Sequence, residues 1–389
     1  MSWNVLNYPD PSAISSDTSF RNPYFREVVQ YINPDIFVIE ELATTNGYLL
    51  FLNNVMNVAG IGQYSAGTFI NGPDTDNDIY YRTSDFQFIS NNPIQTALRD
   101  INEFTLVHNA TSDTIRIYAC HLKASSGIIN EAQRAAEVDS LRKVTNALPV
   151  GSDFIVCGDF NLYGEYEQAY YNLTVDNVTD DGNFNDMLNI PGIWNQPLYS
   201  EYHTQSTRFT SIGGGAPGGM NDRFDMILYS NGIEQPGRIT YISNSFTNIG
   251  NDGMHYNQSI NVMPNTAVPQ NIADALYNTS DHLPVYADFE FAPTGINEYP
   301  SGNSQLQIFP NPTSGNISIH YFLPRESEVN IRIYNFMGEL VNEFHEGKKA
   351  KGNNNKELAD INHLKPGVYF ISLSAGEMFL SKKVVITAD

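Results

Sequence analysis

Residues 154–163 read FIVCGDFNLY, an apolar run that ends abruptly in polar residues. Four apolar residues, Phe154 to Cys157, run directly into Gly158, Asp159 and Asn161. A continuous apolar run is typical of a strand that is covered on both faces. The carboxylate and the amide lie two positions apart and share one side if the extended conformation continues. We therefore expect a core strand that delivers two polar groups to a sheet edge.

The composition sets limits on the number of domains and on the partners. A chain of 389 residues with 41% hydrophobic residues predicts two or three domains with sizeable cores and excludes a disordered chain. The net charge of −22 means that contact with nucleic acid needs local basic residues or divalent cations. The chain has no apolar stretch long enough to span a membrane, and its opening MSWNVLNY reads as a core strand rather than a signal peptide.

Apolar runs alternate with helical segments from residue 1 to about residue 291. The expected strands are 3–7, 36–40, 79–82, 104–108, 115–120, 154–157, 225–229 and 285–291. Helices are expected at 20–32 and at 131–148, where Val138, Leu141 and Val144 recur at intervals of three. The continuously apolar strands predict an α/β fold with layered sheets. Cys120 and Cys157, each inside an apolar run, are expected to be buried free thiols.

The composition and the hydrophobic pattern of the sequence change after residue 291. Residues 292–304 are rich in Pro, Gly, Ser and Asn and are typical of a linker. Residues 305–389 consist of short strand-like runs separated by turn residues, which predicts a small all-β sandwich. The glycine-rich run 213–219 is interpreted as a surface loop.

Polar residues stand where the apolar runs of the first part stop. They are Asn4, Glu41, His121, Asp159, Asn161, Asp225, Asp281 and His282. A helix cap or a turn explains any one of them alone, but strand ends in layered sheets meet at one rim, where functional sites are usually built. Carboxylates without cysteines suit a hard cation. The set fits metal-assisted attack of water on a phosphate ester, whereas the absence of G-x-S-x-G disfavours serine hydrolysis.

Six motifs in this region, in this order, resemble the endonuclease/exonuclease/phosphatase superfamily, also called DNase I-like. They are SWNV, PDIFVIEEL, YACHLK, GDFN, RFDMIL and SDHLPV, and they extend over residues 1–291. One departure is Glu40, where the family usually has Gln. The resemblance implies a four-layer α/β-sandwich, two packed sheets flanked by helices, with metal-dependent phosphoric diester hydrolase activity.

The resemblance also implies roles around a metal. Glu41 binds the catalytic cation, Mg²⁺ with Ca²⁺ or Mn²⁺ as alternatives, and Asn4 and Asp281 lie near it. Asp159 positions or activates the attacking water. Asn161 holds that water or a phosphate oxygen.

Two histidines are assigned to the phosphate by the same resemblance. His121 and His282 contact the scissile phosphate, and His282 carries the proton. Asp225 orients His282 by accepting its second ring proton, which raises the basicity of the imidazole. The alternative for Asp225 is a salt bridge with Arg223, and for His121 a satisfied histidine at a strand end.

Weaker signals lie beside these motifs. NGPDTDNDIYYRT (71–83) places aspartates at alternate positions, as a calcium loop does, but lacks the glycine and the closing glutamate of an EF-hand, so an acidic surface loop is the alternative. The family resemblance offers Asp78 as a partner that orients His121, and Arg82 as a phosphate contact.

Lys123 ends the YACHLK motif and Arg134 lies on the helix that follows. The pattern resembles that of secreted nuclease-like members of the superfamily, which implies that a basic residue here faces the substrate, with a solvated helix face as the alternative. Gly158 is expected to keep bulk away from the metal and the phosphate.

The C-terminal part resembles the type A sorting domain of the type IX secretion system of Bacteroidota, with an immunoglobulin-like sandwich fold. The motifs are IFPNPTSGNISI, IYNFMGELV and LKPGVYFISLSAGEMFLSKKVVIT within residues 305–389. A carbohydrate-binding or adhesive sandwich is the alternative. The resemblance implies the type IX secretion machinery as a partner and a secreted or cell-surface location.

The function expected from both parts is a secreted, monomeric phosphodiesterase, an extracellular nuclease that acts on DNA or RNA. A lipid phosphodiesterase such as a sphingomyelinase, or a phosphatase, is the second hypothesis, and fold alone does not separate them. A hydrophobic membrane-binding loop would favour the lipid substrate, and none is obvious in the sequence. A catalytically inactive surface protein is the third hypothesis.

Overall fold

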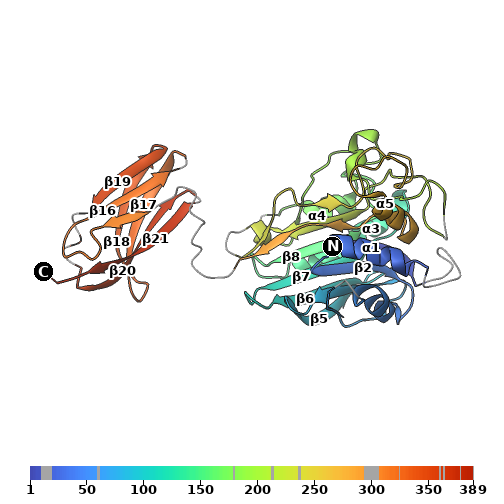
Figure 1. The fold of residues 1–389 in the computed structure, drawn as a ribbon, viewed down its shortest axis with the longest axis horizontal. Coiled ribbons are helices and arrows are strands. Elements are labelled where there is room, and N and C mark those ends of the chain that lie inside the picture. The colour runs from blue at the N-terminus through green and yellow to red at the C-terminus, as the bar shows by residue number, and fades with distance from the viewer. Residues whose placement is uncertain are drawn as a thin grey trace. The chain divides into compact units, whose positions relative to one another are not determined.

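The computed structural model divides the chain into two compact units, Met1–Thr294 and Gly295–Asp389, which we describe separately (Figure 1). The structure describes residues 1–9, 20–58, 62–177, 180–211, 214–234, 238–292, 306–323, 325–358, 361, 364–376 and 378–388. All but the first residue of the expected linker 292–304 lies outside the described residues.

The first unit contains two six-stranded sheets. In the first sheet the order is β12-β13-β1-β2-β4-β3, and β1 (Ser2–Tyr8) runs parallel to β2 (Ile36–Leu42). The other strands are β3 (Tyr64–Ala66), β4 (Asp76–Arg82), β12 (Thr247–Asn248) and β13 (Val285–Tyr286). In the second sheet the order is β5-β6-β7-β8-β10-β9, and β7 (Thr114–His121) runs parallel to β8 (Phe154–Asp159). The other strands are β5 (Phe86–Ile94), β6 (Ile101–His108), β9 (Phe184–Asp186) and β10 (Asp225–Ser230).

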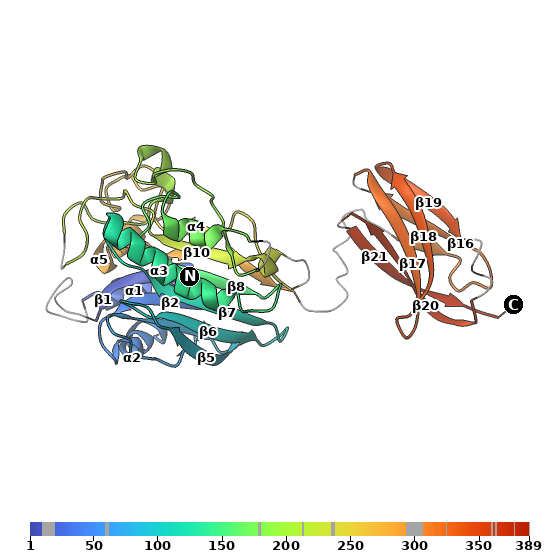
Figure 2. The ribbon, with the colours of Figure 1, turned by 180° about the vertical axis from the view of Figure 1, so that it is seen from behind.

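The two sheets pack face to face and helices cover their outer faces. Val38 and Ile79 of the first sheet share one apolar cluster with Ile155 of the second. Helices α1 (Asn22–Ile32), α2 (Gly47–Phe51) and α5 (Gln270–Thr279) pack on the first sheet. Helices α3 (Ile128–Thr145) and α4 (Gln168–Thr174) pack on the second, as Figure 2 shows. The expected four-layer α/β-sandwich is confirmed.

Smaller elements complete this unit. They are the π-helix η1 (Leu52–Met56), the 3-10 helices η2 (Pro197–Tyr202) and η3 (Asn231–Glu234), and a ribbon of β11 (Ile239–Tyr241) with β14 (Phe289–Phe291). The run expected as one strand at 285–291 is divided between β13 and β14. None of the helices that the structure describes is long and apolar enough to cross a membrane.

Strand β8, with the sequence FIVCGD, lies in the centre of the second sheet. All six residues of β8 are buried, because one face packs against the other sheet and the other face packs against α3 and α4. Cys157 of β8 faces the other sheet, and Cys120 of the neighbouring strand β7 faces α3 and α4. Both are buried free thiols, as expected.

The C-terminal unit consists of two antiparallel sheets around one apolar core. The sheet orders are β15-β16-β19 and β18-β17-β20-β21. The strands are β15 (Gln307–Phe309), β16 (Ile317–Leu323), β17 (Ser327–Asn335), β18 (Leu340–Lys349), β19 (Gly352–Leu358), β20 (Gly367–Ala375) and β21 (Met378–Ile386). Alternate residues of β16, from Ile317 to Leu323, are buried in this core, as a half-covered strand requires. The unit is the all-β sandwich that the sequence predicts.

Candidate active site

Four strand ends bring polar side chains together at one edge of the sandwich. Asn4 and Glu41 come from the parallel pair β1 and β2, and His121 and Asp159 are register partners on the parallel pair β7 and β8. Carboxyl ends of parallel strands meet at the same edge. The sheets pack on each other, so residues more than 100 positions apart meet there.

Irregular backbone in β2 directs Glu41 into this edge. The register of β2 shifts between Ile39 and Leu42, and Glu41 has a φ of +64°. Such bulges redirect side chains near active sites. Glu40, one position earlier, faces the interior instead, is fully buried and accepts a hydrogen bond from Ser2 Oγ at 2.7 Å. Burial raises the pKa of Glu40 well above its ordinary value, which favours the neutral form of this side chain.

Asn4 links the two carboxylates of the site. Its Nδ2 donates to Glu41 Oε1 at 2.9 Å and to Asp159 Oδ2 at 3.1 Å. The second oxygen of Glu41 accepts a hydrogen bond from the backbone N–H of Asn7 at 3.0 Å. Both carboxylates are therefore fixed in place by neutral donors, and each retains acceptor capacity for a cation.

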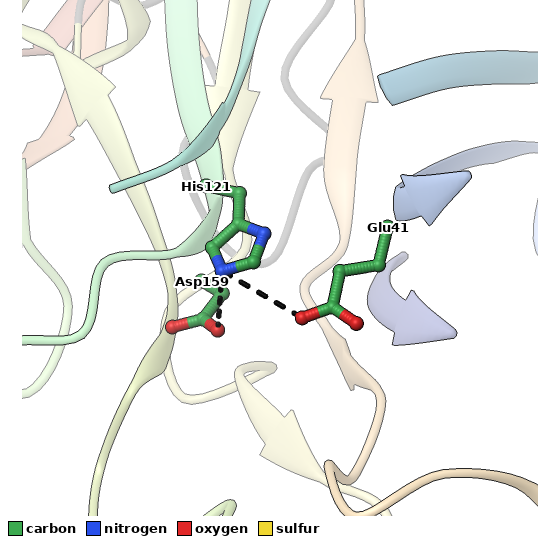
Figure 3. A group of neighbouring side chains, drawn as sticks. All are labelled: Glu41, His121 and Asp159. Atoms are coloured by element: carbon green, nitrogen blue, oxygen red, sulfur yellow. Dashed lines mark ion pairs between the residues drawn. The ribbon is translucent and has the colours of Figure 1, made fainter. Parts of the chain in front are cut away.

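His121 completes a group of three possible metal ligands (Figure 3). Its Nε2 lies 3.7 Å from Glu41 Oε1 and 3.5 Å from Asp159 Oδ2. One ligand atom from each of these residues lies within 4.8 Å of the other two, a spacing that one divalent ion can bridge. Burial, together with the charge of Arg99, lowers the pKa of His121 well below its ordinary value, so the ring is neutral and can act as a ligand.

The electrostatics of Asp159 also fit a cation. Burial and the charges of Asp225 and Glu41 raise its pKa to about 7. Burial and the charge of Asp281 likewise raise the pKa of Glu41. Buried carboxylates that repel one another are stabilised by a bound cation, and oxygen donors suit Mg²⁺ or Ca²⁺. The residues present fit a divalent metal ion.

A second histidine, His282 in the segment after α5, approaches Asp159 and pairs with Asp225 at the start of β10. His282 Nδ1 lies 2.8 Å from Asp225 Oδ2, and His282 Nε2 lies 3.5 Å from Asp159 Oδ2. Burial disfavours the charged ring, but Asp225 and Asp159 outweigh burial and raise the pKa of His282 well above its ordinary value. The alternative pairing of Asp225 with Arg223 is not formed, because Arg223 makes a bidentate ion pair with Asp186 at 2.7 and 2.9 Å.

Asp281 is held by a loop that the sequence analysis placed at the surface. Its Oδ2 accepts from the backbone N–H of Ala216 at 2.6 Å and from Gln205 Nε2 at 3.3 Å. Gly215 and Gly219 of the same loop are buried. Gly214 and Pro217 of the same run are exposed, so over its described residues the run is a surface loop, part of which packs against Asp281.

The backbone around Asp159 differs from the extended path expected for it. Asn161 has a φ of +51° and donates its N–H to Asp159 Oδ1 at 2.9 Å, while its Nδ2 donates to Leu122 O at 3.2 Å. The turn fixes the carboxylate from behind, as Asx turns do. Gly158 has a φ of +136°, and a Cβ there would lie 1.9 Å from Cys120 O. Close approach of the neighbouring strand, rather than room for a ligand, accounts for this glycine.

Asp78, Arg82 and Lys123, which the sequence suggests as additional site residues, do not make the contacts expected of them. Asp78 is buried and accepts from the backbone N–H of Ile79, and His121 Nδ1 has no hydrogen-bond partner among the described residues. Arg82 pairs with Asp35 at 3.2 Å, at the opposite end of β2 from Glu41. Lys123 Nζ donates to Ala124 O at 3.0 Å, directly after the strand of His121.

Two arginines have structural functions that the motifs do not indicate. Arg134 is fully buried, pairs with Glu167 at 2.7 Å and donates to the carbonyl oxygens of Lys123 and Ser125. It therefore braces the loop after β7 and does not face a substrate. Arg99, which no motif contains, donates to His121 O at 3.2 Å and pairs with Asp74 at 3.0 Å. The acidic loop thus contributes to the site through Arg99.

Comparison with known proteins identifies the C-terminal unit and gives distant structural likenesses that cover up to 75% of the chain. Residues 307–387 match the family described as the secretion system C-terminal sorting domain, which confirms the expected sorting domain. No curated protein matches the chain.

Solved structures resemble the chain only distantly. The human Nocturnin catalytic domain with bound sulfate is 18% identical, covers 75% of this chain and 93% of its own, and gives a TM-score of 0.45. TDP2 of D. rerio in complex with a single-strand DNA product is 17% identical, with 74% and 97% covered and a TM-score of 0.47. The mannosyl-6-phosphatase of Bacteroides thetaiotaomicron is 17% identical, with 75% and 98% covered and a TM-score of 0.45. Such likenesses assign neither an activity nor a substrate to this chain.

Proposed function

We propose that the first unit is a divalent-metal-dependent phosphodiesterase of the endonuclease/exonuclease/phosphatase superfamily, and that the C-terminal domain exports it through the type IX secretion machinery. The observation that carries the proposal is the meeting of Glu41, His121 and Asp159 with a His282–Asp225 pair at one edge of the sandwich. Cation ligands and a proton-carrying imidazole within reach of one carboxylate are the groups that hydrolysis of a phosphate ester requires.

The residues of the chain divide the chemistry between them. Glu41 and Asp159, joined by Asn4, would hold the ion, with Asp281 near it; when bound, a divalent ion neutralises charge that develops on the phosphate. Asp159 orients the attacking water through the oxygen that faces both histidines. The neutral ring of His121, which can act as a further ligand of the ion, would lie beside the phosphate.

His282 carries the proton in this proposal. Asp225 accepts from Nδ1–H, which holds the ring in one orientation and leaves Nε2 facing the reacting group. Asn161 holds the carboxylate of Asp159 through its backbone N–H rather than through its side chain.

Nucleic acid is the first substrate class that we propose, and one observation favours a second. Residues 1–292 contain 12 Lys and Arg against 33 Asp and Glu, so a nucleic-acid strand would depend on the bound cations. Ile128 and Ile129 are the first two residues of α3, directly after the loop that follows His121, and they are 82% and 80% exposed. An exposed apolar tip of this kind suits a lipid phosphodiester, although isolated exposed apolar residues are common.

Metal-dependent turnover by the full chain tests the proposal. DNA, RNA, sphingomyelin and bis(p-nitrophenyl) phosphate are each incubated with Mg²⁺ and with EDTA, and hydrolysis of at least one with Mg²⁺ alone is expected. Glu41→Ala should abolish both turnover and the heat of Mg²⁺ binding, whereas Glu27→Ala, at an exposed position of α1, should change neither. Absence of Mg²⁺ binding by the wild-type protein would support the inactive surface protein instead.

A further inference from the structure

Gln205, which lies in no recognised motif, contacts the ring of His282. Its Nε2 lies 2.5 Å from His282 Nε2 and 3.3 Å from Asp281 Oδ2. His282 is buried, whereas Gln205 is only half-buried. The carboxamide therefore covers the ring nitrogen that the proposed function assigns to the phosphate.

The backbone of Gln205 is fixed on both sides. It forms antiparallel bridges to Asp222 and to His282, and its carbonyl oxygen accepts from the N–H of Asp222 at 2.9 Å. The flanking residues continue this pattern, since Leu283 N donates to Thr204 O at 2.8 Å. A side chain on such a segment is positioned as well as one on a regular strand, which a polar contact to a reacting group requires.

Among the contacts of His282 Nε2 with described residues, the Gln205 amide is the one neutral hydrogen-bond donor. Asp159 Oδ2, at 3.5 Å, is an acceptor that repels a phosphate oxygen unless a cation intervenes. Gln205 Nε2 carries two N–H groups, and Asp281 accepts one of them. Two nitrogens 2.5 Å apart can both reach one oxygen at ordinary hydrogen-bond length.

We propose that Gln205 is a substrate-contacting residue whose carboxamide donates a hydrogen bond to the phosphate oxygen that His282 binds. The inference rests on the proposed function and adds a residue to it. Asp281 and the two backbone bridges hold the amide in advance, so the donor costs little reorganisation when the substrate arrives.

Variants of the full chain in Mg²⁺ test this role. Gln205→Met keeps the side-chain length and removes the donor, Gln205→Glu replaces the donor with a charge that repels phosphate, and Gln168→Met alters an exposed glutamine of α4 as a control. Steady-state hydrolysis of bis(p-nitrophenyl) phosphate gives kcat and KM, calorimetry gives the affinity for inorganic phosphate, and thermal unfolding gives Tm.

Loss of one hydrogen bond to a charged oxygen should lower kcat/KM of Gln205→Met by about 10- to 100-fold. Phosphate affinity should fall as well, Tm should be unchanged, and Gln205→Glu should lose more activity than Gln205→Met. Wild-type kcat/KM and phosphate affinity in Gln205→Met would overturn the inference, and so would a loss of activity that accompanies a lower Tm with phosphate affinity intact. His282→Ala separates the two proposals, because full activity in that variant contradicts the proposed function itself.

Discussion

Asp159 should make the metal-free protein less stable as the pH rises, and Asp159→Asn should remove this effect. The folded pKa of about 7 lies above the ordinary value of 3.8, so the folded protein binds the proton more tightly than the unfolded chain does. The stability from the protonated carboxyl is fully present below pH 3.8 and is lost as the pH rises through about 7. Each pH unit between these values costs about 1.4 kcal/mol, so the whole interval costs about 4 kcal/mol.

Tryptophan fluorescence during urea unfolding in EDTA measures this interval. Trp3 and Trp194 are the two tryptophans of the chain and both are buried in the first unit, so the signal reports on that unit alone. Between about pH 4 and about pH 8, the free energy of unfolding of Asp159→Asn relative to wild type should rise by roughly 4 kcal/mol. Added Mg²⁺ should reduce the difference, because the ion binds the ionised carboxylate.

Asp186 supplies a matched control of opposite sign. Its side chain is equally buried, but the charge of Arg223 overcomes the cost of burial and lowers its pKa below the ordinary value. Its stability contribution is present above pH 3.8 and is lost as the pH falls, so Asp186→Asn should become more destabilising as the pH rises. A pH-independent difference for Asp159→Asn, or a difference of the same sign as for Asp186→Asn, would refute the electrostatic reasoning.

Three further predictions concern the construction of the site. Gly158→Ala places a Cβ 1.9 Å from Cys120 O at a φ of +136°, so we expect a loss of about 3 kcal/mol or more in urea unfolding, and an unchanged midpoint would contradict the close approach. Arg134→Met leaves the buried carboxylate of Glu167 unpaired, and we expect a loss of about 3–5 kcal/mol that a second change, Glu167→Leu, largely restores; failure of the double variant to recover would argue against the ion pair as the cause. Glu41→Gln keeps the size of the side chain but removes its charge and one of its two acceptor oxygens, so calorimetry should show Mg²⁺ affinity lower by about 10-fold or more, and wild-type affinity would place the ion elsewhere.

The layers of the fold follow from the sequence because continuous apolar runs are buried on both faces. The run at β8 is of this kind and lies where it was expected. The apolar intervals of α3 mark one packed face instead, and this helix begins three residues before the expected 131–148. Short elements of both sheets and their covering helices that lack such a signal were not anticipated. Helix α5, for example, is short and has no periodic run long enough to separate it from a loop.

The sequence identified the site residues that adjoin apolar runs and missed two that lie outside every motif. Glu41, His121 and Asp159 stand at the ends of apolar runs, and the parallel pairing brings them together. Gln205 and Arg99 lie in segments whose course depends on tertiary hydrogen bonds, which local pattern does not encode.

Two further site predictions, for Arg82 and Asn161, differ from the structure because of strand pairing and backbone conformation. Arg82 follows an acidic loop in the sequence, but antiparallel pairing of β4 with β2 carries it away from the edge where Glu41 lies. Asn161 was expected to point its side chain with Asp159, and a left-handed backbone at that position gives its N–H to the carboxylate instead.

The rate of phosphodiester hydrolysis by wild type and by His282→Ala, both saturated with Mg²⁺, tests the central claim most directly. Wild type should cleave a phosphodiester, EDTA should abolish the cleavage, and loss of the proton-carrying imidazole should lower kcat by about 100-fold or more with the fold intact. A His282→Ala variant that cleaves as fast as wild type would contradict the account.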